Sequence, residues 1–525
     1  MCGIFLLLEN GEISKQRVRE AFNKLEKRGP DNSTLIMENK LWIGFTRLSI
    51  NDMSESANQP FSTDNISLVC NGEIYNHKIL KEKFNISTKS NSDCEVILHL
   101  YEKVGIEQTL NLLDGVFAFI LYDKTKNKIY CARDRIGVRP LFYSNSKNLF
   151  ALASEAKSIE ILGYNSTQLK GGNYIEKYID SDELEIKSFY DIPHPVIYVE
   201  KDEKIQEDMR NLLISAVKKR LMSDRPIGCL LSGGLDSSII AALLTKYSDT
   251  KIKTFSIGFP GSTDLKYARK VAKYIGSEHF ELEISYKEGL DVIEEVIYTL
   301  ESFDTTTIRA SVGMYLLSKY ISENFEEKVI LSGEGADEIL CGYLYFHNSP
   351  SSQSTCDESR KLVEQLPYFD VLRADRCTAS HGLELRVPFL DRDFLDFCMS
   401  LGGNIRKPQK FKDKYYEKYH LRKAFQDLLP EEIIWRRKEG FSDGVGGTEK
   451  PWYSYINDHI NKISVYKNLI ANPISDSEYF LSPEAYHYFK VFEKNFKNFS
   501  SPIPRYWMPM WNSDINDPSG RLIKF

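Results

Sequence analysis

The 525-residue sequence lacks the features of a membrane-bound or nucleic-acid-binding protein. Its apolar runs, such as residues 116–122, are much shorter than the roughly 20 residues that a membrane-spanning helix needs. The formal net charge of −6 leaves no basic excess for nucleic acid or an anionic membrane surface. The first residues carry no basic segment ahead of an apolar one, as a secretory signal would. We therefore expect a cytoplasmic protein with neither nucleic acid nor a membrane as partner.

Cysteine is scarce, and its spacing excludes two further classes of protein. The nine cysteines are odd in number and form no Cys-x-x-Cys pair. A disulfide framework or a zinc site would show paired spacings. Most of the cysteines have apolar neighbours, which predicts reduced, buried thiols.

The length and the order of apolar segments predict two domains, at residues 2–190 and 205–525, because one core rarely serves so long a chain. The first part alternates short apolar strands with turns. It has helical periodicity at 14–27 and at 93–104, the latter with Ser92 as the expected N-cap. This pattern favours two stacked sheets flanked by helices, an α+β arrangement. From about residue 205 strands alternate with helices, which favours an α/β domain with a parallel sheet.

Cys2 stands directly after Met1, a position that can carry chemistry. Removal of the methionine, which a small second residue permits, would leave Cys2 with a free α-amine that can act as base for its own thiol. By position alone the cysteine would more often be incidental. However, the apolar run 4–8 predicts a buried strand, which would fix the terminus in place.

A polar cluster follows the apolar strand that is expected to end at Cys70. A plain turn is one interpretation of Asn71, Gly72 and Glu73. In the other, the Asn71 amide and the Gly72 N–H form an oxyanion hole for a thiolate that attacks an amide carbonyl. Glu73 would then receive the α-ammonium group of an amino-acid substrate.

Two further residues complete this hypothetical amino-acid site. Asp93 would share the α-ammonium group, and Arg47 would clamp the α-carboxylate with two hydrogen bonds. The clusters at 28–31 and 132–135 are interpreted differently, as turns with surface ion pairs.

Six motifs occur in an order that resembles the class II glutamine amidotransferase domain. They are Cys-Gly-Ile at 2–4, Arg-Gly-Pro-Asp at 28–31, Arg-Leu-Ser-Ile at 47–50, Asn-Gly-Glu-Ile-Tyr-Asn at 71–76, Ser-Asp at 92–93 and Ala-Arg-Asp at 132–134. The resemblance implies a four-layer αββα, Ntn-hydrolase-like sandwich in which Cys2 is the nucleophile that hydrolyses glutamine. It implies that glutamine is bound by Arg47, Leu48, Ser49, Ile50, Asn51, Asn71, Gly72, Glu73 and Asp93. Phe45, where relatives often carry histidine, is a departure without an evident catalytic consequence.

Two predicted strands of the second part end in Ser-Gly turns, at 232–234 and 332–333. Carboxyl ends of parallel strands are where nucleotides bind, and glycine N–H groups with a helix N-terminus favour phosphate there. Asp236 would repel phosphate unless a cation lay between them, so Mg²⁺ is indicated. No Gly-Lys-Ser/Thr follows, which excludes a Walker loop.

The segment 232–238 resembles the pyrophosphate loop of the ATP-pyrophosphatase superfamily. With the stretches 307–311, 332–338, 372–376, 383–391 and 437–446, nearly the whole chain resembles the family of glutamine-hydrolysing asparagine synthetases. The resemblance implies an ATP site, with ATP as substrate, formed by Leu231, Ser232, Gly233, Gly234, Leu235, Asp236, Ser237, Ser238, Ile257, Ser332 and Gly333.

The same resemblance implies roles for three charged residues. Asp337 would hold magnesium together with Asp236. Glu334 would take a proton from incoming ammonia, and Lys438 would stabilise charge on the phosphates. From spacing alone, Glu334 could be one acid of an acidic turn and Lys438 one of the four charges at 436–439.

The implied substrates are glutamine, aspartate and ATP, and the implied products are asparagine, glutamate, AMP and diphosphate. β-Aspartyl-AMP would be the intermediate, and ammonia would pass between the domains inside the protein. A synthetase acting on another carboxylate and a catalytically silent regulatory homologue are the alternatives. A homodimer is expected by analogy only.

Several segments depart from the family pattern or carry no assigned chemistry. Gly313 stands where proline is expected, Cys341 replaces a glycine, and Gly440 replaces a glutamine beside Lys438. The serine-rich segment 347–358 is predicted to be a mobile loop. Beyond residue 451 an irregular chain is expected.

Overall fold

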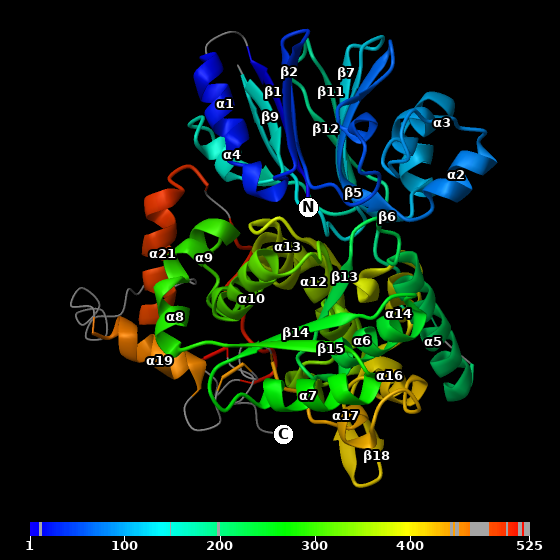
Figure 1. Cartoon of the computed structure of the whole chain (residues 1–525), viewed down its shortest axis with the longest axis vertical. Coiled ribbons are helices and arrows are strands. Elements are labelled where there is room, and N and C mark those ends of the chain that lie inside the picture. The colour runs from blue at the N-terminus through cyan, green and yellow to red at the C-terminus, as the bar shows by residue number, and fades with distance from the viewer. Residues whose placement is uncertain are drawn as a thin grey trace.

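The computed structural model describes residues 1–9, 13–147, 149–196, 200–440, 445–446, 451–462, 482–499, 502–512 and 517–518. Its upper part in Figure 1 is a sandwich of two six-stranded sheets, and its lower part is built around a five-stranded sheet. The expected α+β and α/β arrangements are both confirmed. Among the described residues, no helix is both long enough and apolar enough to cross a membrane.

The first sheet of the sandwich carries the N-terminus on an interior strand. Its antiparallel order is β10 (Thr167–Gln168), β8 (Phe142–Ser146), β9 (Leu149–Ala153), β1 (Gly3–Glu9), β3 (Leu41–Arg47) and β2 (Asn32–Glu38). In β1 the side chains of Ile4 and Leu6 enter the core between the sheets, while those of Phe5 and Leu7 belong to the cluster that includes α1 residues. Both faces of β1 are covered, which explains its continuous apolar run. The predicted buried strand is confirmed.

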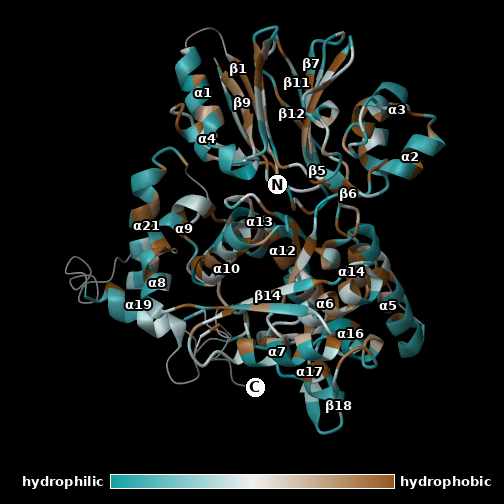
Figure 2. Ribbon diagram, in the orientation of Figure 1, coloured by the Kyte–Doolittle hydropathy of each residue, from teal (hydrophilic) through white to brown (hydrophobic). Residues whose placement is uncertain are grey.

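The second sheet faces the first and completes the four layers. Its order is β12 (Glu185–Ser188), β11 (Asn173–Tyr178), β7 (Lys128–Arg133), β6 (Gly115–Asp123), β5 (Ile66–Ile74) and β4 (Phe61–Ser62). Figure 2 shows brown, apolar strands between mainly teal outer helix faces. The outer layers are α1 (Lys15–Asn23) and α4 (Lys157–Glu160) on one side and α2 (His77–Lys83) and α3 (Val96–Leu112) on the other (Figure 1).

The lower part contains a parallel sheet whose order brings the two Ser-Gly turns together. The order is β15 (Glu278–Glu283), β14 (Lys253–Gly258), β13 (Ile227–Leu230), β16 (Val329–Leu331) and β17 (Glu384–Arg386). Because β13 and β16 are parallel neighbours, the turns that follow them lie at one edge of the sheet.

Helices cover both faces of this sheet. On one side lie α5 (Asp202–Lys219), α6 (Leu235–Tyr247) and α7 (Thr263–Ile275), and on the side facing the sandwich lie α10 (Thr305–Asn324) and α13 (Asp370–Ala379) (Figure 1). The other α-helices among the described residues are α8 (Tyr286–Asp291), α9 (Ile293–Leu300), α11 (Ala336–Ile339), α12 (Ser352–Gln365), α14 (Arg392–Ser400), α15 (Gly403–Arg406), α16 (Tyr419–Ala424), α17 (Glu431–Ile434), α19 (Trp452–Ile460) and α21 (Pro483–Asn495). The 3-10 helices η1 to η5 span Glu26–Arg28, Glu55–Ala57, Leu344–Asn348, Leu366–Tyr368 and Pro388–Leu390, and β18 (Gln409–Phe411) pairs with β19 (Lys414–Tyr416).

Four local predictions were wrong. Ser92 is not the N-cap of α3, which begins four residues later and has Glu95 at that position. Residues 71–73 are not a turn, because β5 continues through them to Ile74. The segment 347–358 is not a loop: it holds the end of η3 and the first half of α12, capped by the Ser351 side chain. Beyond residue 451 the described chain includes the helices α19 and α21.

All nine cysteines are free, and eight of them are buried. This confirms the predicted reduced, buried thiols. Cys341, which stands where the family pattern has glycine, has a φ of 53°, in the left-handed region that glycine adopts most easily.

Candidate active sites

Cys2 lies directly before β1, facing the second half of the chain, and is partly buried. Its thiol donates to the Leu48 carbonyl at 3.7 Å, and its own carbonyl accepts a hydrogen bond from Arg28 Nε at 2.9 Å. Met1 is buried, and its amine donates to the Leu383 carbonyl at 3.0 Å. The predicted nucleophile is thus enclosed between the sandwich and the second half.

Burial determines the protonation of both groups while Met1 is attached. It raises the pKa of the Cys2 thiol to about 11 and lowers the pKa of the Met1 amine to about 5. The thiol is therefore protonated near neutral pH in this form, and thiols are weak nucleophiles when protonated.

Three of the predicted glutamine-binding side chains converge. The Asn51 amide donates to Glu73 at 2.5 Å and to Asp93 at 3.2 Å, and Asp93 also accepts from the Ile74 N–H at 2.6 Å. Burial raises the pKa of Asp93, and hydrogen bonds oppose that rise. This cluster joins the loop after β3 to the end of β5.

The residues Arg47, Ser49, Leu48 and Ile50, which were also predicted to bind glutamine, contact other groups and not this cluster. The Arg47 guanidinium donates to the Ser54 carbonyl at 2.8 Å, to Asn58 at 2.7 Å and to the Asp52 carbonyl. The Ser49 N–H donates to Asp31 at 2.7 Å, whereas the Leu48 and Ile50 side chains are buried in the apolar core.

Asn71 and Gly72 lie within β5, where each has a constrained environment. The Asn71 amide nitrogen is buried and has no hydrogen-bond partner among the described residues. A Cβ at position 72 would lie 2.4 Å from the Val116 carbonyl oxygen, so only glycine fits beside β6. A buried, unpartnered donor is the group that an oxyanion hole requires.

The second half of the chain contributes to the glutamine site, which the sequence did not predict. Arg386, at the end of β17, pairs with Glu73 at 3.2 Å. Burial, Glu384 and Asp93 raise the pKa of Glu73, while Arg386 lowers it.

The interpretation of the two arginine motifs as surface ion pairs was wrong for Arg28, Arg133 and Asp134. Asp31 and Arg135 do form partly exposed pairs, with Arg225 at 3.8 Å and with Asp396 at 2.9 Å. Arg28, Arg133 and Asp134 are at most 2% exposed. Arg133 donates to three backbone carbonyls, and Asp134 accepts from the backbone N–H groups of residues 136–139. Arg133 and Asp134 thus organise a buried turn.

At the parallel sheet, the two Ser-Gly turns form one side of a cavity. Ser232 and Ser237 lie within hydrogen-bond distance, with their hydroxyl oxygens 3.0 Å apart, and the Gly234 N–H donates to Ser232 at 3.3 Å. A Cβ at Gly333 would lie 2.9 Å from the Ser237 nitrogen, and Gly233 has a φ of 72°. Glycine at these positions permits the close approach of the turns.

Most of the predicted ATP residues line this cavity: Leu231, Ser232, Gly234, Leu235, Asp236, Ser237, Ile257, Ser332 and Gly333. Gly233 and Ser238 are not among the lining residues. Gly233 instead packs against the backbone of residues 267 and 268, and Ser238 is fully buried in α6. The lining of the cavity combines apolar side chains from β13, β14 and α10 with charged side chains.

Two carboxylates and two lysines converge in the cavity. Lys418 Nζ lies 2.6 Å from Asp236 Oδ2 and 2.6 Å from Asp337 Oδ1, and Lys438 Nζ donates to Asp337 Oδ2 at 2.5 Å. Burial acts to raise the pKa of Asp337, but the two lysines lower it well below its usual range. Burial acts to lower the pKa of Lys438, yet Asp337 and Asp236 raise it overall. Asp337 and Lys438 are therefore both charged near neutral pH.

Glu334 lies at the same edge of the sheet, bound by an arginine of α13. Arg373 Nη2 donates to Glu334 at 2.8 Å and to Asp370 at 2.6 Å. Burial raises the pKa of Glu334, Arg373 lowers it and Asp370 raises it.

Sequence reasoning missed four cations in the two sites: Lys418, Arg373, Arg386 and Arg436. Arg373 and Arg386 lie in the stretches 372–376 and 383–391, which were matched without a role for either. Arg436 donates to the Gly233 carbonyl at 2.9 Å and lies over the Tyr267 ring. Lys418 lies outside every matched motif, so no sequence signal indicated it. Residues 441–444 of the matched stretch 437–446 lie outside the described residues.

Two family models together match most of the chain. The glutamine amidotransferase domain matches residues 1–189, and asparagine synthase matches residues 208–367 and 358–485. Among curated proteins, the chain is 42% identical to a glutamine-hydrolysing asparagine synthetase of Gallus gallus, covering 100% of this chain and 99% of the relative. It is 40% identical to the Homo sapiens protein of the same name, covering 100% and 98%.

Proposed function

Because the chain belongs to the family of glutamine-hydrolysing asparagine synthetases, we propose that residues 2–190 release ammonia from glutamine and that residues 205–525 transfer it to aspartate. The chain is an ATP-dependent ligase of amino-acid biosynthesis that makes asparagine. One observation supports this division of the reaction between two sites. Where β13 and β16 end, remote in sequence from Cys2, the side chains of Asp236, Asp337, Lys418 and Lys438 converge.

The first half-reaction begins once Met1 has been removed. The Cys2 α-amine accepts the thiol proton, and the thiolate attacks the side-chain amide carbon of glutamine. The Asn71 amide nitrogen and the Gly72 N–H stabilise the oxyanion, which fits the buried, unpartnered Asn71 donor. Ammonia leaves, and water hydrolyses the resulting thioester to glutamate.

Recognition of glutamine would use the charged groups around that thiol. Glu73 and Asp93, which accept hydrogen bonds from Asn51, are the candidates to hold the α-ammonium group, and Arg47 is the candidate for the α-carboxylate. The support is the hydrogen bonding of Asn51 to both carboxylates, together with the burial of Glu73, Asp93 and Arg47, which strengthens charge-assisted hydrogen bonds.

The second half-reaction activates aspartate. Its β-carboxylate oxygen attacks the α-phosphorus of ATP, the bond to the bridging oxygen breaks, and β-aspartyl-AMP and diphosphate form. Lys418 and Lys438 would stabilise the negative charge on the leaving phosphates. Ammonia then adds to the acyl carbon, Glu334 accepts a proton, and AMP leaves as asparagine forms.

The two aspartates also suit a magnesium ion. Asp236 Oδ1 is buried without a hydrogen-bond partner among the described residues, and Asp337 lies across Lys418 from it. Mg²⁺ in phosphate sites is commonly bound by one or two carboxylates together with phosphate oxygens. Asp236 and Asp337 would hold the ion, which supplies neutralising charge to the phosphates.

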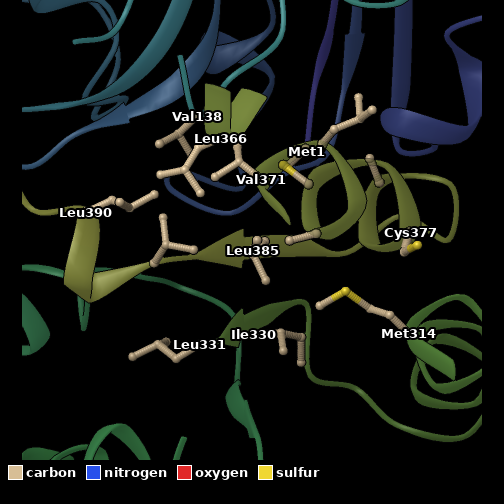
Figure 3. Close-up of a cluster of buried hydrophobic side chains, with 14 of the residues drawn as sticks. Met1, Val138, Met314, Ile330, Leu331, Leu366, Val371, Cys377, Leu385 and Leu390 are labelled. Carbon is tan, nitrogen blue, oxygen red and sulfur yellow. The ribbon is translucent and has the colours of Figure 1, made fainter. Parts of the chain in front are cut away.

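An apolar layer between the two sites supports transfer of ammonia inside the protein. Figure 3 shows Val138, Leu366 and Val371 above Leu385 and Leu331, in one buried cluster. β16, which contains Leu331, leads directly to the Ser-Gly turn and Glu334. Neutral ammonia crosses apolar surroundings more easily than ammonium, since a charge is costly to bury. We propose that ammonia follows this layer.

Two properties stay expectations from composition and resemblance. We infer a cytoplasmic location, which the nine free cysteines support. A homodimer is expected by analogy with the family alone.

Product analysis with all substrates tests the proposed reaction. The protein is incubated with ATP, Mg²⁺, aspartate and glutamine, and asparagine, glutamate, AMP and diphosphate are quantified. We expect asparagine, AMP and diphosphate in equal amounts. ADP in place of AMP would contradict the proposal. Amidation of a different carboxylate, or no turnover at all, would support one of the alternatives drawn from the sequence.

A further inference from the structure

Helix α13 contacts groups of both proposed active sites. Toward its first turn, Arg373 pairs with Glu334 at 2.8 Å. Two residues further along, Asp375 pairs with Arg28 of the sandwich. Figure 1 shows α13 on the side of the parallel sheet that faces the sandwich, close to the N-terminus.

The link from α13 to Cys2 consists of a single arginine. Arg28 Nη1 and Nη2 donate to the two Asp375 oxygens at 2.9 Å and 3.2 Å, a bidentate pair. Arg28 Nε donates to the Cys2 carbonyl at 2.9 Å. Arg28 is 1% exposed and Asp375 is 2% exposed, so water does not compete for these bonds. Asp375 therefore constrains the backbone that carries the thiol.

A second contact, from the next residue of the same helix, reaches β1 at Ile4, two residues after Cys2. Arg376 Nη1 donates to the Ser154 carbonyl at 3.1 Å, and the Ser154 hydroxyl accepts from the Ile4 N–H at 3.0 Å. The backbone on both sides of Gly3 is thus held through α13.

These contacts belong to one buried network of ion pairs across the interface. Arg376 pairs with Glu155 and with Glu301, each at 3.0 Å, and Glu155 also pairs with Arg28 at 2.9 Å and with Lys157 at 2.8 Å. With Asp375 the network has three cations and three anions, so its formal charge is zero. Buried charges that are all paired fix geometry closely, because any displacement leaves a charge without its partner.

We propose that Asp375 is a positioning residue for the glutaminase reaction and that it makes the reactivity of Cys2 depend on the nucleotide site. This inference rests on the proposed role of Cys2 as nucleophile. Asp375 holds Arg28, and Arg28 holds the Cys2 carbonyl. When Glu334 changes its partner during asparagine formation, Arg373 on the same helix is displaced, and α13 transmits the change to Arg28.

The test compares Asp375→Asn with wild type in three assays. They are glutamine hydrolysis without other substrates, glutamine hydrolysis with ATP and aspartate, and asparagine synthesis from ammonium. We expect kcat for glutamine hydrolysis to fall about tenfold or more, because small displacements of a reacting group have effects of this order. KM for glutamine and ammonium-dependent synthesis should stay near wild type. The change in hydrolysis on adding ATP and aspartate should be present in wild type and absent in the variant.

Three further variants keep the inference falsifiable. Asp396→Asn breaks another ion pair between the two halves, Arg135–Asp396 at 2.9 Å, which touches neither site, and should behave as wild type. Arg28→Lys retains the charge without the bidentate geometry and should reproduce the loss if Asp375→Asn does not fold. In the double variant Arg28→Gln/Asp375→Asn, kcat for glutamine hydrolysis should be no lower than in the more impaired of the single variants Arg28→Gln and Asp375→Asn.

The outcomes separate this inference from the proposed function. A wild-type protein that does not hydrolyse glutamine would overturn both. A wild type that hydrolyses glutamine, together with an Asp375→Asn variant of unchanged kcat or an undiminished response to ATP and aspartate, would overturn the inference alone. Equal losses in hydrolysis and in ammonium-dependent synthesis would assign Asp375 a merely structural role and overturn it as well.

Discussion

Cys2→Ala is expected to abolish asparagine synthesis from glutamine while leaving synthesis from added ammonium near the wild-type rate. The thiol is the proposed nucleophile, and removal of a nucleophile typically lowers kcat by about 10³-fold or more. The nucleotide site lies on other elements, at the ends of β13 and β16, and keeps all its groups. Both rates can be followed by quantifying asparagine with either nitrogen source.

Cys356→Ala is the matched control for this variant. It removes another buried thiol, on α12 in the second half of the chain, which is not among the residues that line the nucleotide cavity. Both activities should persist in it. Loss of ammonium-dependent synthesis in Cys2→Ala would contradict the separation of the two sites.

Lys438→Met should have the complementary effect. The methionine retains the length of the side chain but removes the charge that pairs with Asp337 at 2.5 Å. Loss of one preorganised charge at a transition state commonly costs about 10² to 10³ in kcat. Synthesis from glutamine and from ammonium should fall together, whereas glutamine hydrolysis measured without ATP should stay close to wild type.

The control is Lys412→Met, which removes an exposed lysine paired with Glu431. Surface pairs of this kind contribute little to stability, so this variant should retain both syntheses. If Lys438→Met kept ammonium-dependent synthesis at the wild-type rate, Lys438 would have no part in adenylation.

Strands and turns were predictable where local pattern alone determines them. The run 4–8 is apolar throughout because both faces of β1 are covered. The Ser-Gly turns follow strands whose parallel pairing brings them to one edge of the sheet. In both cases neighbouring residues carry the information, so composition and spacing are sufficient.

Prediction failed where tertiary contacts override local composition. The serine-rich start of α12 resembles a loop, yet Thr355, Cys356 and Ser359 are buried on one face of a helix. Helical structure there is stabilised by packing rather than by propensity. Residues 71–73 contain turn-forming types but stay in β5, because β6 pairs along that whole stretch.

The charged groups of the sites were the hardest to assign. Arg28 and Asp375 are 347 residues apart in sequence, and Arg386 reaches Glu73 from the other half of the chain. A salt bridge between distant segments leaves no periodic or spacing signal. Surface exposure was therefore the default expectation for Arg28, although the structure buries it.

Ammonia is expected to pass from the Cys2 site to the nucleotide site without entering the solvent. The most direct measurement is the ratio of asparagine formed to glutamine hydrolysed, with and without an added enzyme that consumes free ammonia. We expect this ratio to be unchanged by the added enzyme. If asparagine formation fell while glutamate formation continued, ammonia would be leaving the protein between the two reactions, which would contradict transfer inside the protein.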